Sequence, residues 1–363
     1  MTPSKKKLNI AMIGTGFIAK AHSNAFRQVG HFFDVPYELE LKVLCGRNEA
    51  KRDAMASTWG WAETASDWHQ VVGRADIDII DIATPNVLHA PIALAAAQAG
   101  KTIFCEKPLA MSLAEAESMA GVVKSPSLVW FNYRRIPAVA LAKRMIEEGR
   151  LGEIYHYRGV YLNESGSNPS KATTWRYRRS ESGSGAMGDL LAHSLDLALY
   201  LNGPLSELTA MTHTFAAGRD VDDAAMLLAR FENGSIGTFE ATRFGVGSRN
   251  RNSFEIHGSR GMLGFNLEDM NRLIYYDATE APSLRAARNL MVTGPGHPYS
   301  ENFWKPGHTI GYEHTFIATL GDFLLALAKG EEFHPNFDDA VVVQRLLSAV
   351  EESAGSRVWV KSA

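Results

Sequence analysis

The stretch GDLLAHSLD, residues 188–196, brings together side chains that can exchange protons. Asp189 and His193 are four residues apart, and His193 and Asp196 are three apart, so a helix places all three on one face. Such a face fits an acid–base centre, a metal site or a solvated surface. The leucines of the stretch fit an ordinary amphipathic helix equally well. The elements around the stretch must decide between these interpretations.

Size and composition set the first limits. The chain has 363 residues, which predicts two domains, and 45% of them are hydrophobic, enough for a sizeable core in each. The net charge of −3 gives no overall field that would recruit nucleic acid or an anionic membrane, so we expect neither as a partner. The basic start leads into a run too short and too glycine-rich for a signal peptide, and no run is long enough for a membrane span.

The cysteines agree with a cytoplasmic location, which is our expectation. Cys45 and Cys105 are far apart in sequence and follow apolar runs, so they are predicted to be buried thiols and not a disulfide framework or a metal site.

Residues 1–135 alternate between strand and helix patterns. This rhythm predicts an α/β Rossmann domain with a parallel sheet covered on both faces. The expected strands are 7–13, 38–45, 77–83, 101–105 and 128–132, and the expected helices lie near 19–29, 49–58, 90–99 and 113–123.

A glycine motif, GTGFIA at residues 14–19, follows the first strand and opens its helix. Gly14 permits a tight turn, and Gly16 lets backbone approach a pyrophosphate at the helix N-terminus, with Phe17 and Ile18 beside it. Ala19 replaces the third glycine of the usual pattern. The strand–turn–helix context makes a dinucleotide site the favoured interpretation, although a glycine turn without a ligand would have the same letters.

The end of the second strand bears on the choice between NAD and NADP. Sites for NAD usually carry an acidic residue here, but the tip reads Cys45-Gly46-Arg47-Asn48. Arg47 is expected either to pair with a 2′-phosphate, to stack on adenine, or to be a solvated surface arginine. The sequence therefore slightly favours NADP as the cofactor and does not exclude NAD.

Two further strand ends are expected to line the same edge of the sheet. ATPNVLHA, residues 83–90, follows the third strand, and CEKPL, residues 105–109, follows the fourth. Pro108 restricts Lys107 to an extended conformation, where its ammonium group can hydrogen-bond a substrate hydroxyl. The residues expected to contact the cofactor from these two stretches are Thr84, Pro85, Asn86, His89, Glu106 and Lys107.

Residues 136–363 have a different pattern and are expected to form an α+β domain with a large, mostly antiparallel sheet that binds substrate and mediates oligomerisation. After a helix at 136–149, strands are predicted at 154–164, 206–215, 224–231, 235–243, 252–257, 262–266 and 273–276, with terminal helices at 315–329 and 338–352. Asn233-Gly234 is a strong hairpin signal between two of these strands. The Gly- and Pro-rich segment 278–308 is either functional or disordered.

An aromatic and a basic residue precede the opening stretch. Trp175 and Arg176 suit the apolar face of a sugar and its hydroxyls, or a carboxylate, unless Trp175 is a core residue. The glycines of 180–188 are expected to form a mobile entry to the helix that carries Asp189.

Taken in order, GTGFIA, ATPNVLHA, CEKPL and GDLLAHSLD resemble the glucose–fructose oxidoreductase and inositol dehydrogenase family (Gfo/Idh/MocA) over essentially the whole chain. FNYRR at 131–135 and TWRYRR at 174–179 are similar to family segments near the substrate pocket, which adds Tyr133 and Arg134 to the expected substrate contacts. Ala192 stands where many members have Gly, a small change that removes no catalytic group.

The resemblance implies that Lys107, Asp189 and His193 form the catalytic trio, and that a face of the second sheet serves a homodimer or homotetramer. In alcohol oxidation a nicotinamide accepts the hydride, and His193 is our candidate for the proton. Asp189 would share the substrate hydroxyls or orient the imidazole, Lys107 would complete the site, and Asp196 would support the helix. A metal is not expected, because no third or fourth ligand follows Asp189 and His193 at a suggestive spacing.

The resulting expectation is an NAD(P)-dependent oxidoreductase that interconverts a secondary alcohol and a ketone on an inositol, anhydrosugar or monosaccharide. One alternative is an NAD-dependent glycosidase that oxidises a sugar transiently and eliminates. The other is a dinucleotide-binding sensor without catalysis, against which the intact Lys107, Asp189 and His193 argue. The sequence leaves the sugar, the direction and the oligomeric state open.

Overall fold

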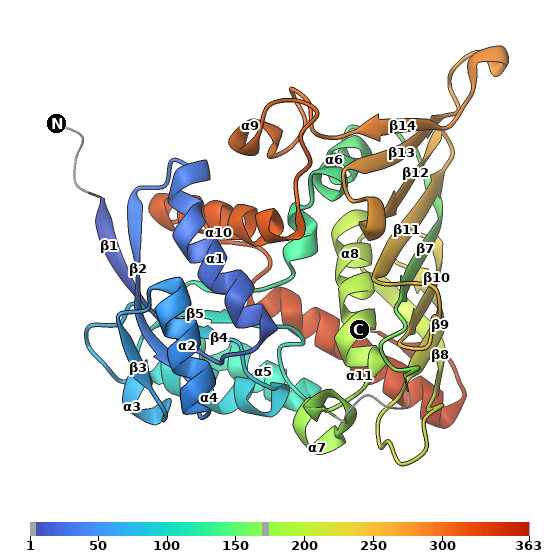
Figure 1. The fold of residues 1–363 in the computed structure, drawn as a ribbon. Coiled ribbons are helices and arrows are strands. Elements are labelled where there is room, and N and C mark those ends of the chain that lie inside the picture. Colours follow the sequence, from blue (N-terminus) through green and yellow to red (C-terminus); the bar gives the residue numbers. More distant parts are fainter. Residues whose placement is uncertain (1–4, 169–173, 363) are drawn as a thin grey trace. The chain divides into compact units, whose positions relative to one another are not determined.

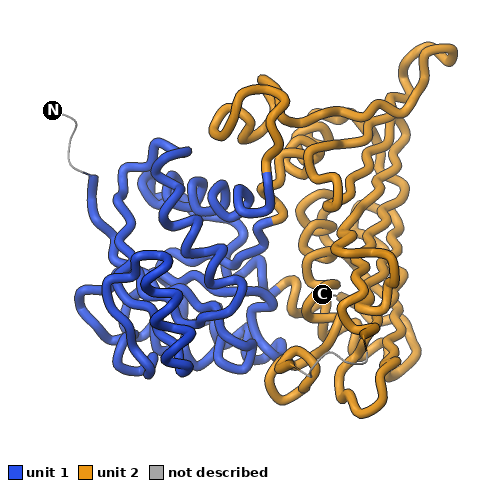
Figure 2. Tube along the Cα trace, in the orientation of Figure 1, with its two compact units in different colours: residues 1–132, 311–341 blue, residues 133–310, 342–363 orange. Residues whose placement is uncertain are grey.

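The computed structural model describes residues 5–168 and 174–362. The chain divides into two compact units (Figure 2). Unit 1 runs to Asn132 and takes in Gly311–Val341, and unit 2 comprises Tyr133–Ile310 and the residues from Val342. The units thus differ from the expected domains 1–135 and 136–363, because helix α10 (Tyr312–Lys329) packs along helix α1 (Phe17–Phe32) of unit 1.

Unit 1 contains a parallel sheet of six strands among its described residues, in the order β3-β2-β1-β4-β5-β6 (Figure 1). Because the strands are parallel, their carboxyl ends all lie at one edge of the sheet. The order of the strands along the chain runs outward in one direction from β1 to β3 and in the other from β4 to β6, as in dinucleotide-binding folds. The expected α/β class is confirmed. Strand β3, only three residues long and largely polar, was not predicted. The strands are β1 (Lys6–Ile13), β2 (Tyr37–Cys45), β3 (Glu63–Ala65), β4 (Ile79–Ile82), β5 (Thr102–Cys105) and β6 (Ser127–Val129).

Local capping sets where the helices of unit 1 begin and end. Asn48 accepts a hydrogen bond from the Lys51 N–H at the start of α2, and Ser112 accepts one from the Glu115 N–H at the start of α5. Gly60 ends α2 in the left-handed conformation. Besides α1 and α10, the helices are α2 (Glu49–Trp59), α3 (His69–Val72), α4 (His89–Gln98) and α5 (Leu113–Val122).

Unit 2 contains a nine-stranded sheet in its described part, antiparallel except where β7 pairs with β10. This confirms the mostly antiparallel second sheet. Gly234, with φ of 87°, makes the predicted hairpin between β9 and β10. The strands are β7 (Ile154–Leu162), β8 (Leu205–His213), β9 (Ala224–Phe231), β10 (Ile236–Thr242), β11 (Arg251–Gly258), β12 (Gly261–Asn266), β13 (Arg272–Asp277), β14 (Arg288–Met291) and β15 (Val360–Lys361).

Helix α8 (Ala192–Asn202) packs against β7 and β11 on one face of this sheet (Figure 1). A single π-helical turn, η4 (Met187–Leu191), precedes α8. The sequence predicted a regular helix here, and the structure replaces its first turn with this wider one. The other helices that begin after Asn132 are α6 (Pro137–Glu147), α7 (Arg179–Ser182), α9 (Ser300–Phe303) and α11 (Phe337–Ser356).

The Gly- and Pro-rich segment 278–308 carries defined structure. Strand β14 pairs with β13, and α9 follows it. Asn271 holds the middle and the far end of the segment, because its carbonyl oxygen accepts a hydrogen bond from Val292 N–H and its side chain exchanges two hydrogen bonds with the backbone of Ile310. The segment is therefore an ordered extension of the sheet edge.

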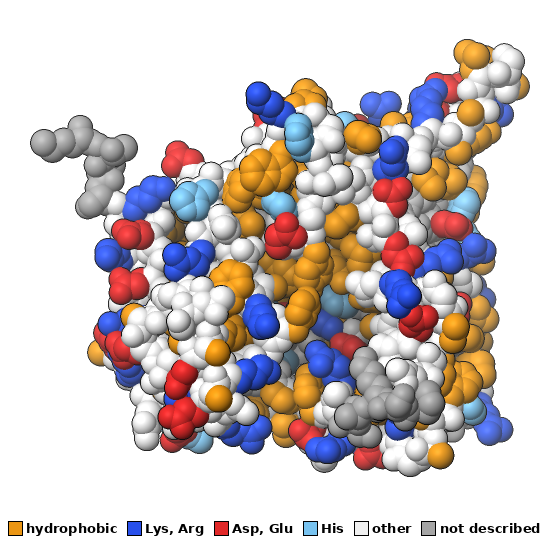
Figure 3. Space-filling model, viewed as in Figure 1, with side chains coloured by type: hydrophobic (Ala, Val, Ile, Leu, Met, Phe, Trp, Pro, Cys, Tyr) orange, Lys and Arg blue, Asp and Glu red, His pale blue; other side chains and the backbone are white. Residues whose placement is uncertain are grey.

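The surface agrees with the mixed composition. Among the residues drawn in colour in Figure 3, acidic and basic side chains are interspersed on the face in view. No helix in the described ranges combines the length and the apolar character needed to cross a membrane.

A buried ion pair fastens α8 to the start of unit 2. The guanidinium of Arg134 donates to both carboxylate oxygens of Asp196, with distances of 2.6–3.1 Å, and the two side chains are only 7% and 2% exposed. The guanidinium also lies 5.3 Å from the ring of Tyr200. Since the pair is desolvated on both sides, removing one member leaves a buried charge without its counter-ion.

We therefore expect Asp196→Ala to lower the free energy of unfolding by about 3–5 kcal/mol, as for other broken buried pairs. Glu148→Ala is the matched control, because Glu148 pairs with Arg150 just after α6 with about half of each side chain exposed. That change should cost no more than about 1 kcal/mol. Urea unfolding measures both. Equal losses would show that the buried pair is no more stabilising than the exposed one.

Candidate functional site

The loops at the carboxyl edge of the sheet in unit 1 begin by continuing the strand ladder. Gly14 N–H donates to Cys45 O, Ala83 N–H to Ile13 O, and Glu106 N–H to Ile82 O, each at 2.9–3.0 Å. Gly14 has φ of +127°, and a Cβ there would lie 2.1 Å from the Ala83 oxygen. Glycine at 14 is thus required by the fold itself.

The N-terminus of α1 is open enough for a dinucleotide phosphate. Gly16 is its N-cap, without any side-chain cap, and a Cβ on Gly16 would meet nothing within 4 Å. The hydroxyl of Thr84, at the neighbouring strand end, is buried and has no hydrogen-bond partner in the protein. A 16-residue helix with an uncapped start, beside an unsatisfied hydroxyl, fits a pyrophosphate-containing cofactor.

The other residues expected to contact the cofactor near Gly16 differ in how exposed their side chains are. Phe17 is 70% exposed and stacks on Tyr312 with ring centroids 6.3 Å apart. Ile18 is half-buried, and Asn86 is buried at the start of a short 3-10 turn that follows Pro85. Arg47 is exposed at the tip of β2, while Asn48 uses its side chain to cap α2.

The Glu106-Lys107-Pro108 turn is held from both sides. Glu106 Oε2 accepts a hydrogen bond of 3.2 Å from the Lys107 N–H. The fully buried ring of His89 has one nitrogen 3.0 Å from Pro108 O and the other 3.2 Å from Thr84 O. Burial lowers the pKa of His89. The neutral ring has a single N–H and donates to only one of these two oxygens. His89 lies between the two loops that were expected to contact the cofactor, and its direct cofactor contact stays a prediction.

Sequence reasoning missed a buried polar cluster behind this turn. His22 of α1 lies with Nδ1 2.8 Å from Asp81 Oδ2 and Nε2 3.1 Å from Glu106 Oε1. Trp130 Nε1–H donates to the other Asp81 oxygen at 2.9 Å. Two signals were present in the sequence: an acidic residue inside the apolar run IDIIDIA, and a histidine on the apolar side of the first helix.

In unit 2 the carboxylate of Asp222 anchors the glycine-rich entry to the candidate helix, and the mobility expected of this entry stays a prediction. The carboxylate of Asp222 accepts the N–H groups of Gly185 and Met187, both at 2.7 Å. A Cβ on Gly185 would lie 1.8 Å from the Asp222 carbonyl oxygen, so only glycine allows this approach. Burial raises the pKa of Asp222, and these two N–H donors act in the opposite direction.

Asp189 lies in the π-helical turn and forms an ion pair that the sequence did not reveal. Arg243 directly follows β10 and is 2% exposed, and its Nη2 lies 3.0 Å from Asp189 Oδ2. The Nε of Arg176 lies 3.8 Å from the same oxygen. Asp189 remains 29% exposed, so a buried guanidinium holds it from behind while part of the carboxylate faces solvent. Turns of π-helix are frequent at functional sites.

His193 follows one turn later and is enclosed by aromatic rings. Its ring centroid lies 4.5 Å from that of Tyr133 and 5.9 Å from that of Tyr161. The two tyrosine hydroxyls are 3.2 Å apart, and Tyr161 donates to Asn250 Oδ1 at 2.8 Å. The two tyrosine rings therefore pack against the imidazole, and the contacts of their hydroxyl groups hold the tyrosines in place.

The remaining expected substrate residues separate into two kinds. Trp175 is half-buried and carries the Arg176 guanidinium 4.5 Å from its ring centroid, so it is not a core residue. Arg134 is buried, and its Nε and Nη2 groups bind Asp196. The predicted contact between Arg134 and the substrate stays a prediction, whereas the ion pair of Arg134 with Asp196 is part of the structure.

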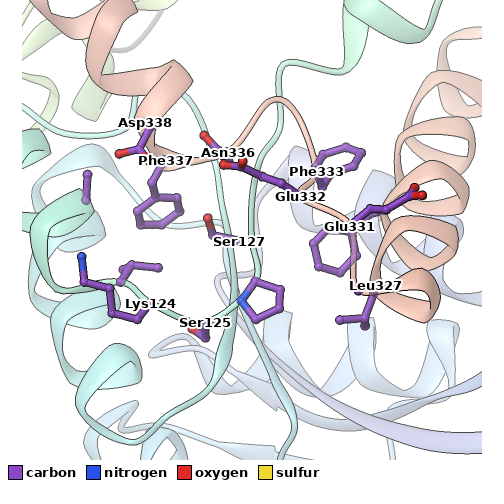
Figure 4. A pocket seen from close by; sticks show the side chains of 15 residues that line it. Lys124, Ser125, Ser127, Leu327, Glu331, Glu332, Phe333, Asn336, Phe337 and Asp338 are labelled. Atoms are coloured by element: carbon purple, nitrogen blue, oxygen red, sulfur yellow. Dashed lines mark hydrogen bonds between the residues drawn. The ribbon is translucent and has the colours of Figure 1, made fainter.

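Two further features bear on where a ligand could bind: possible metal ligands, and a cavity in unit 1. No group of three or more possible metal ligands occurs within residues 5–168 and 174–362. A cavity of about 500 Å³ lies between the ends of α5 and α10 (Figure 4). Ser127, the first residue of β6, lines it, so this cavity is at the amino end of that strand, away from the carboxyl edge.

Comparisons with known proteins agree with this geometry. Residues 8–133 match the model of an oxidoreductase family with an NAD-binding Rossmann fold, and residues 139–264 match the GFO/IDH/MocA C-terminal domain. The chain is 40% identical to a levoglucosan dehydrogenase of Pseudarthrobacter phenanthrenivorans, over 98% of both chains. It is 25% identical to an inositol 2-dehydrogenase of Rhizobium meliloti, over 96% of this chain and 98% of that protein.

A solved structure of levoglucosan dehydrogenase in complex with NADH and levoglucosan superposes with a TM-score of 0.96, at 41% identity over 98% of this chain and 99% of that one. These findings support NAD(H), and the lean to NADP drawn from Arg47 has no support in them. The chain belongs to the GFO/IDH/MocA family and is an NAD(P)-dependent dehydrogenase.

Proposed function

We propose that the protein uses NAD(H) to interconvert a secondary alcohol and a ketone on a cyclic sugar, with an anhydrosugar as the first substrate to test. The observation that carries the proposal is the pairing of Asp189 with the buried Arg243, one turn before an imidazole enclosed by two tyrosines. A carboxylate held by an ion pair and an imidazole packed against two tyrosine rings suit hydroxyl recognition and proton transfer. Levoglucosan is the anhydrosugar named for the relative at 40% identity.

In this proposal each side chain has one task. His193 accepts the hydroxyl proton during oxidation and returns it during reduction. Asp189, held by Arg243, accepts a hydrogen bond from a substrate hydroxyl, and the ammonium of Lys107 donates one to the reacting oxygen. The nicotinamide, when bound, takes up the hydride.

The sugar contacts proposed around these groups come from Trp175, Arg176 and Tyr133. The half-buried ring of Trp175 offers an apolar surface, and the stacked Arg176 offers donors beside it. Arg176 also approaches Asp189, so a hydroxyl bound by one of them is within reach of the other's charge.

The first test is turnover. We expect purified protein to reduce NAD⁺ with levoglucosan faster than with myo-inositol, glucose or xylose, followed by nicotinamide absorbance. His193→Ala should lower kcat by at least about 100-fold, because a positioned general base contributes that much, while NADH still binds. His31→Ala, at an exposed histidine in the last turn of α1, is the control and should leave kcat unchanged.

Near-normal turnover by His193→Ala would remove His193 from the mechanism. Release of a glycosyl leaving group without net NAD⁺ reduction would support the glycosidase instead. Tight NADH binding without either reaction would support the sensor.

A pair of glycine variants tests the cofactor position. Gly14→Ala is expected to unfold or strongly destabilise the protein, because its Cβ would collide with the Ala83 backbone. Gly16→Ala should keep the Tm of the parent, since its Cβ meets no protein atom within 4 Å, but should weaken NADH binding measured by fluorescence. Unchanged NADH affinity in Gly16→Ala would place the pyrophosphate elsewhere.

We further infer that a second copy of the chain covers the face of the nine-stranded sheet opposite α8. Met226 and Leu228 of β9 are 43% and 52% exposed and alternate with buried residues, and Met211 of β8 pairs with Met226 across the ladder. Exposed apolar residues grouped on one sheet face are typical of subunit contacts.

Sedimentation equilibrium should therefore give a dimer or tetramer for the parent protein. Leu228→Glu should shift the equilibrium toward monomer, whereas Val246→Glu, at an exposed loop residue after β10, should not. A parent protein that is entirely monomeric would contradict the inferred subunit contact.

A further inference from the structure

We propose that His22 is a positioning residue for the Lys107 turn: through its Nε2 contact with Glu106 it fixes the backbone from which the catalytic lysine extends. The inference rests on the proposed function only in giving Lys107 a catalytic role. The contacts that carry it lie within unit 1 and stand independently of the substrate.

The first observation is that both ring nitrogens of His22 face carboxylates. Nδ1 lies 2.8 Å from Asp81 Oδ2, and Nε2 lies 3.1 Å from Glu106 Oε1. A neutral imidazole has only one N–H, so it can donate to only one of these oxygens, whereas an imidazolium donates to both. The geometry is therefore that of a protonated ring bridging two anions.

The surroundings of His22 agree with a protonated ring. Burial alone lowers the pKa of His22, but the charges and hydrogen bonds of Asp81 and Glu106 outweigh burial and raise it to about 9. Trp130 stacks on the ring with centroids 4.2 Å apart, an arrangement that favours a cation. The groups that face the ring are Asp81 from β4, Glu106 after β5, Trp130 after β6, Phe26 from α1 and Phe316 from α10.

The second observation is that Glu106 passes the constraint to Lys107. One Glu106 oxygen binds His22, and the other accepts the Lys107 N–H at 3.2 Å. Glu106 is 7% exposed, so a loss of the His22 contact would leave a mostly buried carboxylate oxygen short of a donor. The carboxylate would then turn toward solvent and release the Lys107 backbone.

The third observation is that the cluster joins four segments of the carboxyl edge. His22 belongs to α1, Asp81 to β4, Glu106 to the turn after β5, and Trp130 follows β6 and bonds back to Cys105 O. The helix with the proposed pyrophosphate site and the turn with the proposed catalytic lysine are thereby held in one network. A purely packing role for His22 would not need both nitrogens to face carboxylates.

The test compares two isosteric substitutions. In Asn the side-chain nitrogen can occupy the position of His Nδ1, so His22→Asn keeps a donor for Asp81 and loses the one for Glu106. In Gln the nitrogen can occupy the position of Nε2, so His22→Gln keeps a donor for Glu106. Ser23→Ala is the control for lost buried polarity, because Ser23 is the neighbouring fully buried residue of α1 and accepts from Trp61 Nε1.

We expect His22→Asn to lower kcat by about 10- to 100-fold, the range caused by slight misplacement of a catalytic group, with a smaller change in KM for the sugar. His22→Gln should recover a substantial part of that kcat. The alkaline fall in kcat near the pKa of His22, about 9, should be present in the parent and in Ser23→Ala and absent in both His22 variants. Equal kcat losses in the two His22 variants, or losses that follow Tm alone, would overturn the proposal.

Nitrogen NMR of the parent protein separates this inference from the proposed function. With ¹⁵N-labelled histidine and lysine, both ring nitrogens of His22 should be protonated near neutral pH. The Lys107 amide should exchange faster with solvent in His22→Asn than in His22→Gln. If the parent turned over no sugar, the proposed function would fail while these two readouts still tested the contact. A neutral His22, or identical Lys107 exchange in both variants, would refute the positioning role.

Discussion

The rest of the structure depends on one constraint: at the carboxyl edge of a parallel sheet, backbone groups lose their ladder partners just where the functional loops begin. Here the loops continue the ladder for one more residue. Gly14, Ala83, Glu106 and Trp130 each donate an N–H to the last residue of a neighbouring strand. These bonds keep the start of each loop in register with the sheet, so side chains far apart in sequence lie at one edge. The open helix start at Gly16 and the Lys107 turn both follow from that arrangement.

In unit 2, buried arginines hold carboxylates in fixed positions. Arg134 pairs with Asp196, Arg219 with Asp223, and Arg243 with Asp189. Each guanidinium is mostly buried, so its carboxylate is fixed in place by the cost of separating the charges. Asp196 and Asp223 are themselves buried, whereas Asp189 is 29% exposed. Two of these ion pairs, at Asp196 and Asp223, therefore stabilise the fold of unit 2. The third holds the carboxylate of Asp189, which is still accessible to solvent.

The sequence predicted the elements whose residues obey a simple period or turn rule. The alternation of residues 1–135, the turn at Gly14 and the hairpin at Asn233-Gly234 all appear in the structure. Asp189 and His193 could be singled out because they share a helical face. The partners of these residues were out of reach, since Arg243 is 54 residues beyond Asp189 and nothing in its local sequence marks it as buried. Tertiary packing decides whether a charged residue is buried, so a local sequence pattern does not predict that burial.

The π-helical turn shows why spacing alone gave an incomplete picture of the opening stretch. Asp222 captures the N–H groups of Gly185 and Met187, and the close approach of Gly185 to the Asp222 backbone fixes where the helix must start. The chain then needs an extra residue in the turn before α8 takes over at Ala192, and Ala192 N–H reaches back to Met187 O. That wider turn carries Asp189 beside Arg243 and Arg176, while His193 lies on the regular helix between Tyr133 and Tyr161. One short segment thus directs the side chains of Asp189 and His193 into different surroundings, an ionic one and an aromatic one. In the proposed mechanism, the ionic surroundings hold a carboxylate for hydroxyl recognition, and the aromatic ones hold an imidazole for proton transfer.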